Sequence, residues 1–237
     1  MLDPLRLDAV VFDLDDTLVN WREAEAGAIG DLARSEFAPR GFGEARVRAT
    51  YDEVMAENMR SWAQLRRWWY ISERLHLLSE RLGTAVDLPG THLAETFGRD
   101  VTRRLALLDG AVEALRAARR HGRKTALLTN GRGETQRPKI LRFGLDREVD
   151  FVGITGELGS WKPDAEAFHK VLRELGVEPH RATMVGDSVD FDLVPAKALG
   201  MQTVMVGGAP NEAADHHVAT PGHLVGLLPA PAPPVKR

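Results

Sequence analysis

The stretch from Ala9 to Leu18, AVVFDLDDTL, decides the fold of this chain. Its first four residues are apolar and include two valines, a pattern typical of a short buried strand. Three carboxylates and a hydroxyl follow directly, on Asp13, Asp15, Asp16 and Thr17. In an open parallel sheet, ligands bind beyond the carboxyl ends of the strands, so we expect these side chains to lie where chemistry takes place.

Asp13 and Asp15 point to the same side of the chain if the backbone stays extended between them. Two close carboxylates repel each other unless a cation or a proton lies between them. The pair therefore indicates a bound metal ion, a raised pKa, or both. A turn of aspartates that closes an ordinary surface strand is the alternative that this stretch alone leaves open.

The composition excludes several classes of protein. The chain has 237 residues, of which 43% are hydrophobic and 27% charged, as in ordinary globular proteins. Its net charge of −3 gives no reason to expect nucleic acid or a membrane surface as a partner. It has no cysteine, which excludes disulfides, thiolate metal sites and a cysteine nucleophile. We see no secretory signal and no apolar stretch near the roughly 20 residues of a membrane span, so we expect a cytoplasmic protein.

Residues 20–106 lack strand character and predict an α-helical bundle. The four helices are expected over residues 23–37, 44–59, 61–82 and 89–104. The third is the most periodic, because one face carries Trp68, Ile71, Leu75, Leu78 and Leu82. A segment of this size is large enough to hold a small core of its own.

The third of these helices also carries aromatic and basic side chains whose roles stay open. Trp62 and Trp69 form a second stripe and either pack in the core of the bundle or stack on a substrate ring. Arg66 or Arg67 lies on a solvated helix face or pairs with a second anionic group of a substrate.

From Leu107 onward, strands alternate with helices, which predicts right-handed crossovers and a parallel sheet. We expect strands over residues 124–129, 150–155, 182–185, 202–206 and 217–219. Helices are expected over residues 111–121, 134–143, 164–175, 193–199 and 223–228, with a loop over residues 156–163. The predicted fold class is α/β, with a Rossmann-like, doubly wound parallel sheet built from residues 1–19 and 107–228. The helical bundle of residues 20–106 interrupts it after the first strand, and the proline-rich residues 229–237 are expected to be a disordered tail.

Polar groups also follow three later strands of the predicted sheet. They are Thr129 with Asn130, then Lys162, then Asp187 with Asp192. Because the carboxyl ends of parallel strands lie at one edge of a sheet, we expect these groups to meet Asp13 in one cleft. Each has an ordinary explanation when taken alone: turn chemistry, a solvated lysine, or a helix N-cap. Their joint occurrence in this order favours a functional site.

These motifs resemble those of the haloacid dehalogenase-like hydrolase superfamily over nearly the whole chain. The superfamily's first motif, an apolar strand followed by D-x-D-x-T-L, is matched at residues 13–18. Its second, a strand that ends in Ser or Thr, is matched at Thr129. Its third, a lysine usually followed by proline, is matched at Lys162-Pro163, and its fourth, G-D-x4-D, at residues 186–192. The helical insertion resembles the α-helical cap of the dehalogenase-like branch.

The resemblance implies a Mg²⁺-dependent phosphatase that hydrolyses a small phosphate monoester through an aspartyl-phosphate intermediate, with the cap setting specificity. It implies that Asp13 is the nucleophile. Asp15 is then the general acid and base, which protonates the leaving oxygen and later takes a proton from the hydrolytic water. A halide leaves without a proton, and dehalogenases of the superfamily lack a carboxylate at this position. Asp15 therefore favours a phosphatase.

The resemblance also implies a metal site and a phosphate site. Mg²⁺ would bind the Asp13 carboxylate, the Asp15 backbone carbonyl and Asp187, and Asp192 would support the metal from behind these ligands or through a water. The phosphate oxygens would be bound by the Thr129 hydroxyl, by backbone amides around Asn130, and by Lys162 as a fixed positive charge.

Other functions stay open at this point. A phosphomutase or a 2-haloacid dehalogenase of the same superfamily is one alternative, and a catalytically inactive binding protein on the same fold is another. A signalling receiver domain also groups acids, a hydroxyl and a lysine around Mg²⁺, but it is about half this length and needs no helical insertion. The expected partner is a small phosphate ester, and the chain is expected to be a monomer or a homodimer.

Overall fold

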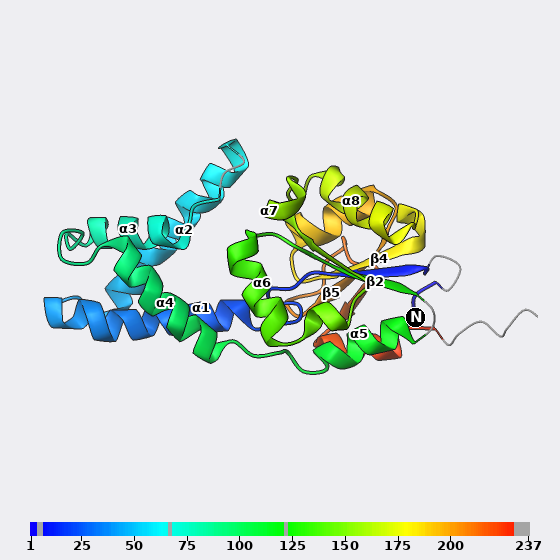
Figure 1. Cartoon of the computed structure of the whole chain (residues 1–237), viewed down its shortest axis with the longest axis horizontal. Helices are drawn as coiled ribbons and strands as arrows, with labels where there is room; N and C mark the ends of the chain where they lie inside the picture. Colours follow the sequence, from blue (N-terminus) through cyan, green and yellow to red (C-terminus); the bar gives the residue numbers. More distant parts are fainter. Residues whose placement is uncertain (4–6, 66–67, 121–122, 230–237) are drawn as a thin grey trace, which may run out of the picture. The chain divides into compact units, whose positions relative to one another are not determined.

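The computed structural model describes residues 1–3, 7–65, 68–120 and 123–229. The chain forms two compact units, Met1–Asn20 with Ala106–Arg237, and Trp21–Leu105. We call the first the α/β unit and the second the cap; Figure 1 shows the elements of each. Arg66 and Arg67 lie outside the described residues, as does all but the first residue of the tail predicted over residues 229–237.

The α/β unit is built on a sheet of six parallel strands in the order β3-β2-β1-β4-β5-β6. The strands are β1 (Ala9–Phe12), β2 (Lys124–Thr129), β3 (Phe151–Ile154), β4 (Ala182–Gly186), β5 (Gln202–Val206) and β6 (His216–Val218). The chain moves from β1 outward to β3, then returns to β4 on the other side of β1. The predicted α/β, doubly wound parallel fold is confirmed, and the strand order reverses between β1 and β4, where such sheets bind ligands.

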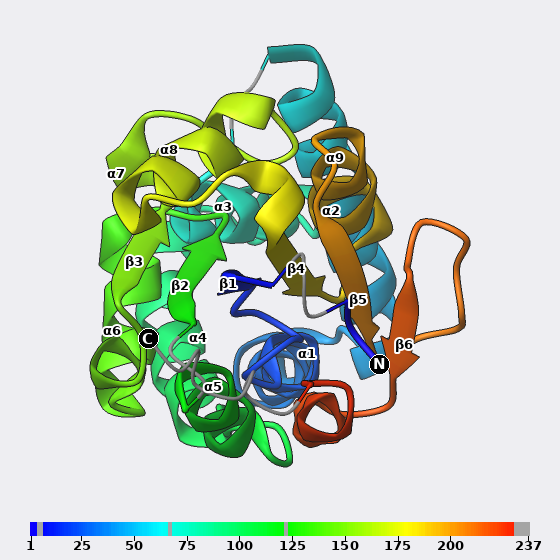
Figure 2. The ribbon, with the colours of Figure 1, turned by 90° about the vertical axis from the view of Figure 1, so that its right-hand side faces the viewer.

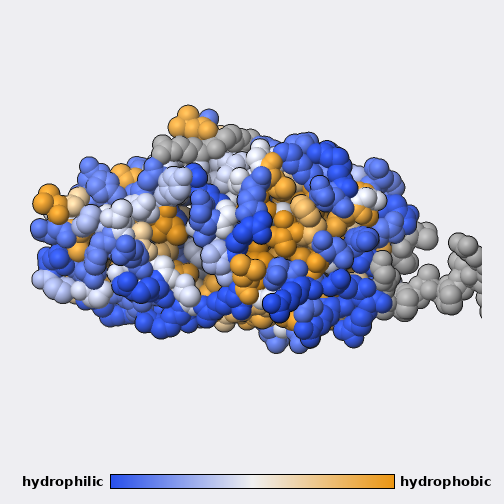
Figure 3. All heavy atoms as spheres, in the orientation of Figure 1, coloured by the Kyte–Doolittle hydropathy of each residue, from blue (hydrophilic) through white to orange (hydrophobic). Residues whose placement is uncertain are grey.

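Helices cover both faces of this sheet (Figure 2). They are α5 (Ala111–Arg119), α6 (Gly133–Arg142), α7 (Thr155–Leu158), α8 (Ala165–Leu175) and α9 (Val194–Ala198). On the face of α8 and α9, alternate strand residues such as Val11, Leu128 and Met184 pack in one cluster with Phe168 of α8. Burial on both faces explains why the central strands are continuous apolar runs rather than alternating ones. Hydrophilic residues cover much of the outer surface in Figure 3.

Three elements of the α/β unit differ from their prediction. The loop expected over residues 156–163 begins with the short helix α7, which ends at Gly159 in the left-handed region. A π-helical turn over Val189–Leu193 precedes α9, so the helix predicted from residue 193 is shorter. The last predicted helix, over residues 223–228, is instead a 3₁₀ helix over Pro221–Gly226, where a proline at the first turn fixes the start.

The cap contains four α-helices, α1 (Trp21–Leu32), α2 (Glu44–Leu65), α3 (Ile71–Arg81) and α4 (Gly90–Arg104). A π-helical turn over Ala33–Phe37 and a 3₁₀ turn over Ala38–Arg40 continue α1 until Gly41, which adopts a left-handed φ of 86°. The cap has its own apolar core, which includes Leu32, Phe37, Val54, Leu75, Leu78, Leu93 and Phe97. In the part of the chain that the structure describes, no helix is long and apolar enough to cross a membrane.

The single helix predicted over residues 61–82 is wrong. Helix α2 continues through Leu65, and α3 begins only at Ile71. The apolar spacing misled because the two stripes on which the prediction rested belong to different helices: Trp62 of one is buried in α2, and Leu75 with Leu78 of the other are buried in α3. Periodicity alone does not show where one helix ends and the next begins.

At Trp69 and Tyr70, side chains accept the backbone hydrogen bonds that a continuous helix would have made. The backbone N–H of Trp69 donates to Oδ1 of the buried Asn58 at 2.9 Å. The backbone N–H of Tyr70 donates to the Glu73 carboxylate at 2.7 Å, an N-terminal cap for α3. Because these donors have partners outside a helix ladder, the break is a stable local structure.

We expect Asn58→Ala to lower the free energy of unfolding by about 1–3 kcal/mol, because it leaves the Trp69 N–H without its acceptor. Gln64→Ala, an amide removed from the exposed side of the same helix, is the control and should be nearly neutral. Urea unfolding followed by circular dichroism measures both. Equal stabilities of the two variants would show that Asn58 does not stabilise the break.

Candidate active site

The buried ammonium of Lys162 lies at the centre of the site. Lys162 lies between α7 and α8, and only 2% of its surface is exposed. Its Nζ donates to Oδ1 of Asp13 at 2.7 Å and to Oδ1 of Asp192 at 2.5 Å. Asp13 follows β1 and Asp192 lies in the turn after β4, so the ion pairs join two neighbouring strand ends to a third loop.

Asn130, the residue after β2, holds the backbone of Lys162. Its Nδ2 donates to the Lys162 carbonyl at 3.0 Å, and its Oδ1 accepts from the Lys162 N–H at 3.0 Å. This reciprocal pair fixes the loop from which the ammonium extends. The side chain of Asn130 is therefore used in positioning Lys162, and its backbone is the part that remains for the anion predicted at this strand end.

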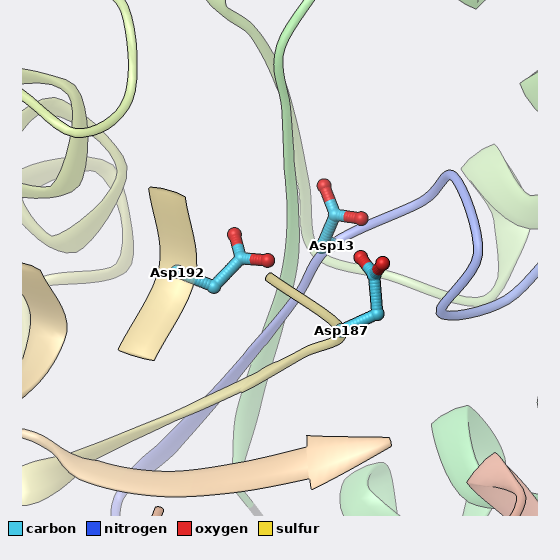
Figure 4. A group of neighbouring side chains, drawn as sticks. All are labelled: Asp13, Asp187 and Asp192. Atoms are coloured by element: carbon cyan, nitrogen blue, oxygen red, sulfur yellow. The ribbon is translucent and has the colours of Figure 1, made fainter. Parts of the chain in front are cut away.

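Three carboxylates form an acidic cluster at the carboxyl ends of β1 and β4. Asp13, Asp187 and Asp192 each present an oxygen within 4.8 Å of the others, and Figure 4 shows their carboxylates grouped around a common space. A set of hard oxygen donors without nitrogen or sulfur suits Mg²⁺. The residues present therefore fit the predicted metal ion.

Burial and charge act in opposite directions on the two central groups. Burial raises the pKa of the Asp13 carboxyl well above its usual range; Lys162 lowers this pKa, and Asp192 and Asp187 raise it. Burial alone would lower the pKa of Lys162, but Asp13 and Asp192 together raise it above its ordinary value. Lys162 therefore stays charged at neutral pH, whereas full ionisation of Asp13 calls for further positive charge.

Gly186 lets the Asp192 side chain approach the end of β4. A Cβ on this glycine would lie 2.5 Å from Cγ and 2.6 Å from Cβ of Asp192, closer than side-chain atoms pack. Asp192 is 1% exposed, and its Oδ2 accepts a hydrogen bond from the Ser188 N–H at 3.2 Å. The glycine of the fourth motif thus has a steric reason in this chain.

Asp15 contacts a different set of partners from Asp13. Both of its carboxylate oxygens accept from Nζ of Lys139 at 2.7 Å, and Oδ2 also accepts from Nε2 of Gln136 at 2.9 Å. The same amide nitrogen donates to Oγ1 of Thr129 at 2.6 Å. Helix α6 therefore connects the acid after β1 with the hydroxyl that ends β2.

The turn after these acids has a left-handed residue. Asp16 has a φ of 61°, a conformation that aspartate tolerates better than most residues, and its N–H donates to the Val19 carbonyl at 2.7 Å. Thr17 is fully buried, and its hydroxyl has no hydrogen-bond partner among the described residues. Asp16 thus has a structural place in the turn.

Comparison with known proteins agrees with the motifs. The family model described as haloacid dehalogenase-like hydrolase matches residues 7–200. The chain belongs to this family. Among curated relatives, it is 34% identical to the phosphoserine phosphatase of Thermus thermophilus, over 83% of this chain and 87% of that protein. It is 28% identical to the ribulose-1,5-bisphosphate 5-phosphatase of Halopiger xanaduensis, over 93% and 98%.

A solved haloacid dehalogenase-like structure has the same fold. The HAD-hydrolase YfnB from Bacillus subtilis, crystallised with magnesium, aligns with a TM-score of 0.73 at 19% identity. The alignment covers 94% of this chain and 98% of that one. At this identity the likeness concerns the fold.

Gln136 and Lys139 are the site residues that sequence reasoning missed. They lie three residues apart on α6, so they share a helix face, and both are buried although polar, at 2% and 7% exposure. This spacing on the helix that follows the second motif is the one signal that could have indicated them.

We expect Gly186→Ala to weaken Mg²⁺ binding by about 10–100-fold, because the added methyl group displaces the Asp192 carboxylate. Isothermal titration with MgCl₂ measures the affinity, and circular dichroism checks that the variant is folded. Gly98→Ala, where a Cβ meets nothing within 4 Å, is the control and should bind like the wild type. A folded Gly186→Ala protein with unchanged affinity would contradict this account of Asp192.

Proposed function

We propose that this family member is a Mg²⁺-dependent phosphatase that hydrolyses a small phosphate monoester through an aspartyl-phosphate on Asp13. The observation that carries the proposal is the buried Lys162, whose ammonium donates hydrogen bonds to both Asp13 and Asp192. Asp15 follows Asp13 at the end of the same strand. Two of the curated relatives, a phosphoserine phosphatase and a ribulose-1,5-bisphosphate 5-phosphatase, support the reaction class.

Asp13 is the proposed nucleophile. Its carboxylate lies at the point where the strand order reverses, and Lys162 donates to Oδ1. Attack of an Asp13 oxygen on phosphorus breaks the bond to the leaving oxygen and forms the aspartyl-phosphate. Water then attacks that phosphorus, which releases inorganic phosphate and regenerates the carboxylate. Lys162 supplies a fixed positive charge beside Asp13 and the phosphoryl group, which both carry negative charge in these steps.

Asp13, Asp187 and the backbone carbonyl of Asp15 would hold Mg²⁺, with Asp192 beside them. When bound, the ion neutralises negative charge on the phosphate and on the Asp13 carboxylate. The raised pKa of Asp13 supports this proposal, because burial and the neighbouring carboxylates of Asp192 and Asp187 disfavour the ionised form, and a bound cation would offset both effects.

Asp15 is the proposed general acid and base. It gives a proton to the leaving alcohol oxygen as the phosphorus–oxygen bond breaks, and it later takes one from the attacking water. Because a departing halide needs no proton, a carboxylate here favours a phosphatase over a dehalogenase. No described feature favours a phosphomutase or an inactive binding protein.

Thr129 is a proposed ligand of the phosphate oxygens, together with Lys162 and the backbone at Asn130. The Thr129 hydroxyl accepts a hydrogen bond from Gln136, an amide nitrogen that can only donate. Its own proton is therefore available for a phosphate oxygen. In this arrangement the Thr129 hydroxyl accepts from Gln136 and can donate to a phosphate oxygen at the same time.

The cap, Trp21–Leu105, is the proposed determinant of substrate specificity. Trp62 is buried in it and stacks on Trp68, with ring centroids 5.2 Å apart, so Trp62 packs within the cap. Trp69 is half-buried, and a contact between it and the substrate stays a prediction.

The oligomeric state, monomer or homodimer, also stays a prediction.

We expect phosphate release from at least one member of a panel of phosphoserine, sugar phosphates, nucleoside monophosphates and phosphoglycolate. The release should require Mg²⁺, stop in EDTA and return with excess MgCl₂, because the ion balances the acidic cluster. Asp13→Asn should lower kcat by at least about three powers of ten with the fold intact. The matched control is Asp146→Asn, which removes an exposed carboxylate of the same unit and should keep full activity.

The same panel includes a 2-haloacid, with halide release as the measurement. Halide release without phosphate release would show a dehalogenase. Near-wild-type phosphatase activity of Asp13→Asn would exclude Asp13 as the nucleophile.

A further inference from the structure

Two buried polar side chains of helix α6 contact Asp15, the second acid after β1. Nζ of Lys139 donates hydrogen bonds to both carboxylate oxygens of Asp15, and Nε2 of Gln136 donates one to Oδ2. Lys139 is 7% exposed and Gln136 is 2% exposed, whereas the Asp15 side chain is 24% exposed. A buried ammonium without a partner is costly, so this face of α6 is organised around the Asp15 carboxylate.

The end of β2 is shaped to admit the Gln136 side chain. Gly131 has a φ of 149°, and a Cβ there would lie 2.7 Å from Cγ and 2.8 Å from Cδ of Gln136. Only glycine leaves room for the amide at this point. The amide then donates to Asp15 and to Thr129 at once, so the two groups are fixed relative to each other.

The hydrogen-bond donors around Asp15 distinguish its two carboxylate oxygens. Among the residues that the structure describes, Oδ2 accepts from Lys139 and Gln136, whereas Oδ1 accepts from Lys139 alone. A carboxylate oxygen has room for about two hydrogen bonds, so Oδ1 retains a lone pair for a further proton. The contacts therefore set the rotation of the carboxyl group as well as its position.

We propose that Lys139 and Gln136 are positioning residues that hold Asp15 with Oδ1 presented to the leaving oxygen. This inference rests on the proposed function, because it assigns no chemistry to Lys139 or Gln136 themselves. Their effect is on the alignment of Asp15 with the leaving oxygen, and small errors in such alignment lower the rate strongly.

The test compares two phosphate monoesters with the wild type, Lys139→Met and Asp15→Asn. The leaving oxygen of an alkyl phosphate needs a proton. The p-nitrophenolate group of p-nitrophenyl phosphate leaves readily without one. We expect Lys139→Met to lower kcat for the alkyl phosphate by about 10–100-fold. The loss for p-nitrophenyl phosphate should be several times smaller, and KM should change little for either substrate.

The decisive measurement is the double variant Lys139→Met/Asp15→Asn. If Lys139 acts through Asp15, the double variant should be no slower on the alkyl phosphate than Asp15→Asn alone. Arg142→Met removes a charge from the exposed side of the same helix and should leave both substrates unaffected. Lys139→Arg keeps the charge and should recover part of the lost rate. If Lys139→Met does not fold, Lys139→Gln, which also removes the charge, takes its place with the same expected results.

Three results would overturn the inference while the proposed function stands: an unchanged kcat in Lys139→Met, an equal loss with both substrates, or a further loss in the double variant. If the wild type released no phosphate from any ester, the proposed function would fail first, and this inference with it. The two failures are thus distinguishable in one set of assays.

Discussion

The contact between the buried ammonium of Lys162 and the carboxylates of Asp13 and Asp192 is the interaction on which the rest of the site depends. A buried charge without a partner costs several kcal/mol, so the ammonium and the carboxylates are stable only together. The three residues come from separate loops, and their meeting requires that β1 and β4 lie side by side and that the segment between α7 and α8 closes over them. The fold and the site therefore stabilise each other.

Backbone shape at the strand ends makes these contacts sterically possible. Gly186 leaves space for the Asp192 carboxylate, and Gly131 leaves space for the Gln136 amide. Asn130 holds the backbone of Lys162 with two hydrogen bonds. Two glycines and the side chain of Asn130 thus place the polar groups of the site without reacting themselves, as a preorganised arrangement of charges requires.

Much of this arrangement follows from the sequence, because parallel strands bring their carboxyl ends to one edge. The residues after β1, β2 and β4 could be expected at one site once the strands were recognised, and the α/β fold class is confirmed. The break before α3 could not be predicted, because it depends on acceptors from Asn58 and Glu73 rather than on apolar periodicity. The contact of Lys139 with Asp15 also stayed hidden, since it depends on how closely α6 approaches the turn after β1.

The central claim is that Asp13, held beside Lys162, forms a covalent bond to phosphorus. Its most direct test is to stop the reaction while the enzyme turns over substrate in the presence of Mg²⁺. Any acyl phosphate is then reduced with borohydride, and mass spectrometry locates the modified residue. Our account predicts homoserine in place of Asp13, with Asp15, Asp187 and Asp192 unmodified. Reduction at another carboxylate, or no reducible acyl phosphate under conditions that trap this intermediate in an established aspartyl-phosphate enzyme, would contradict it.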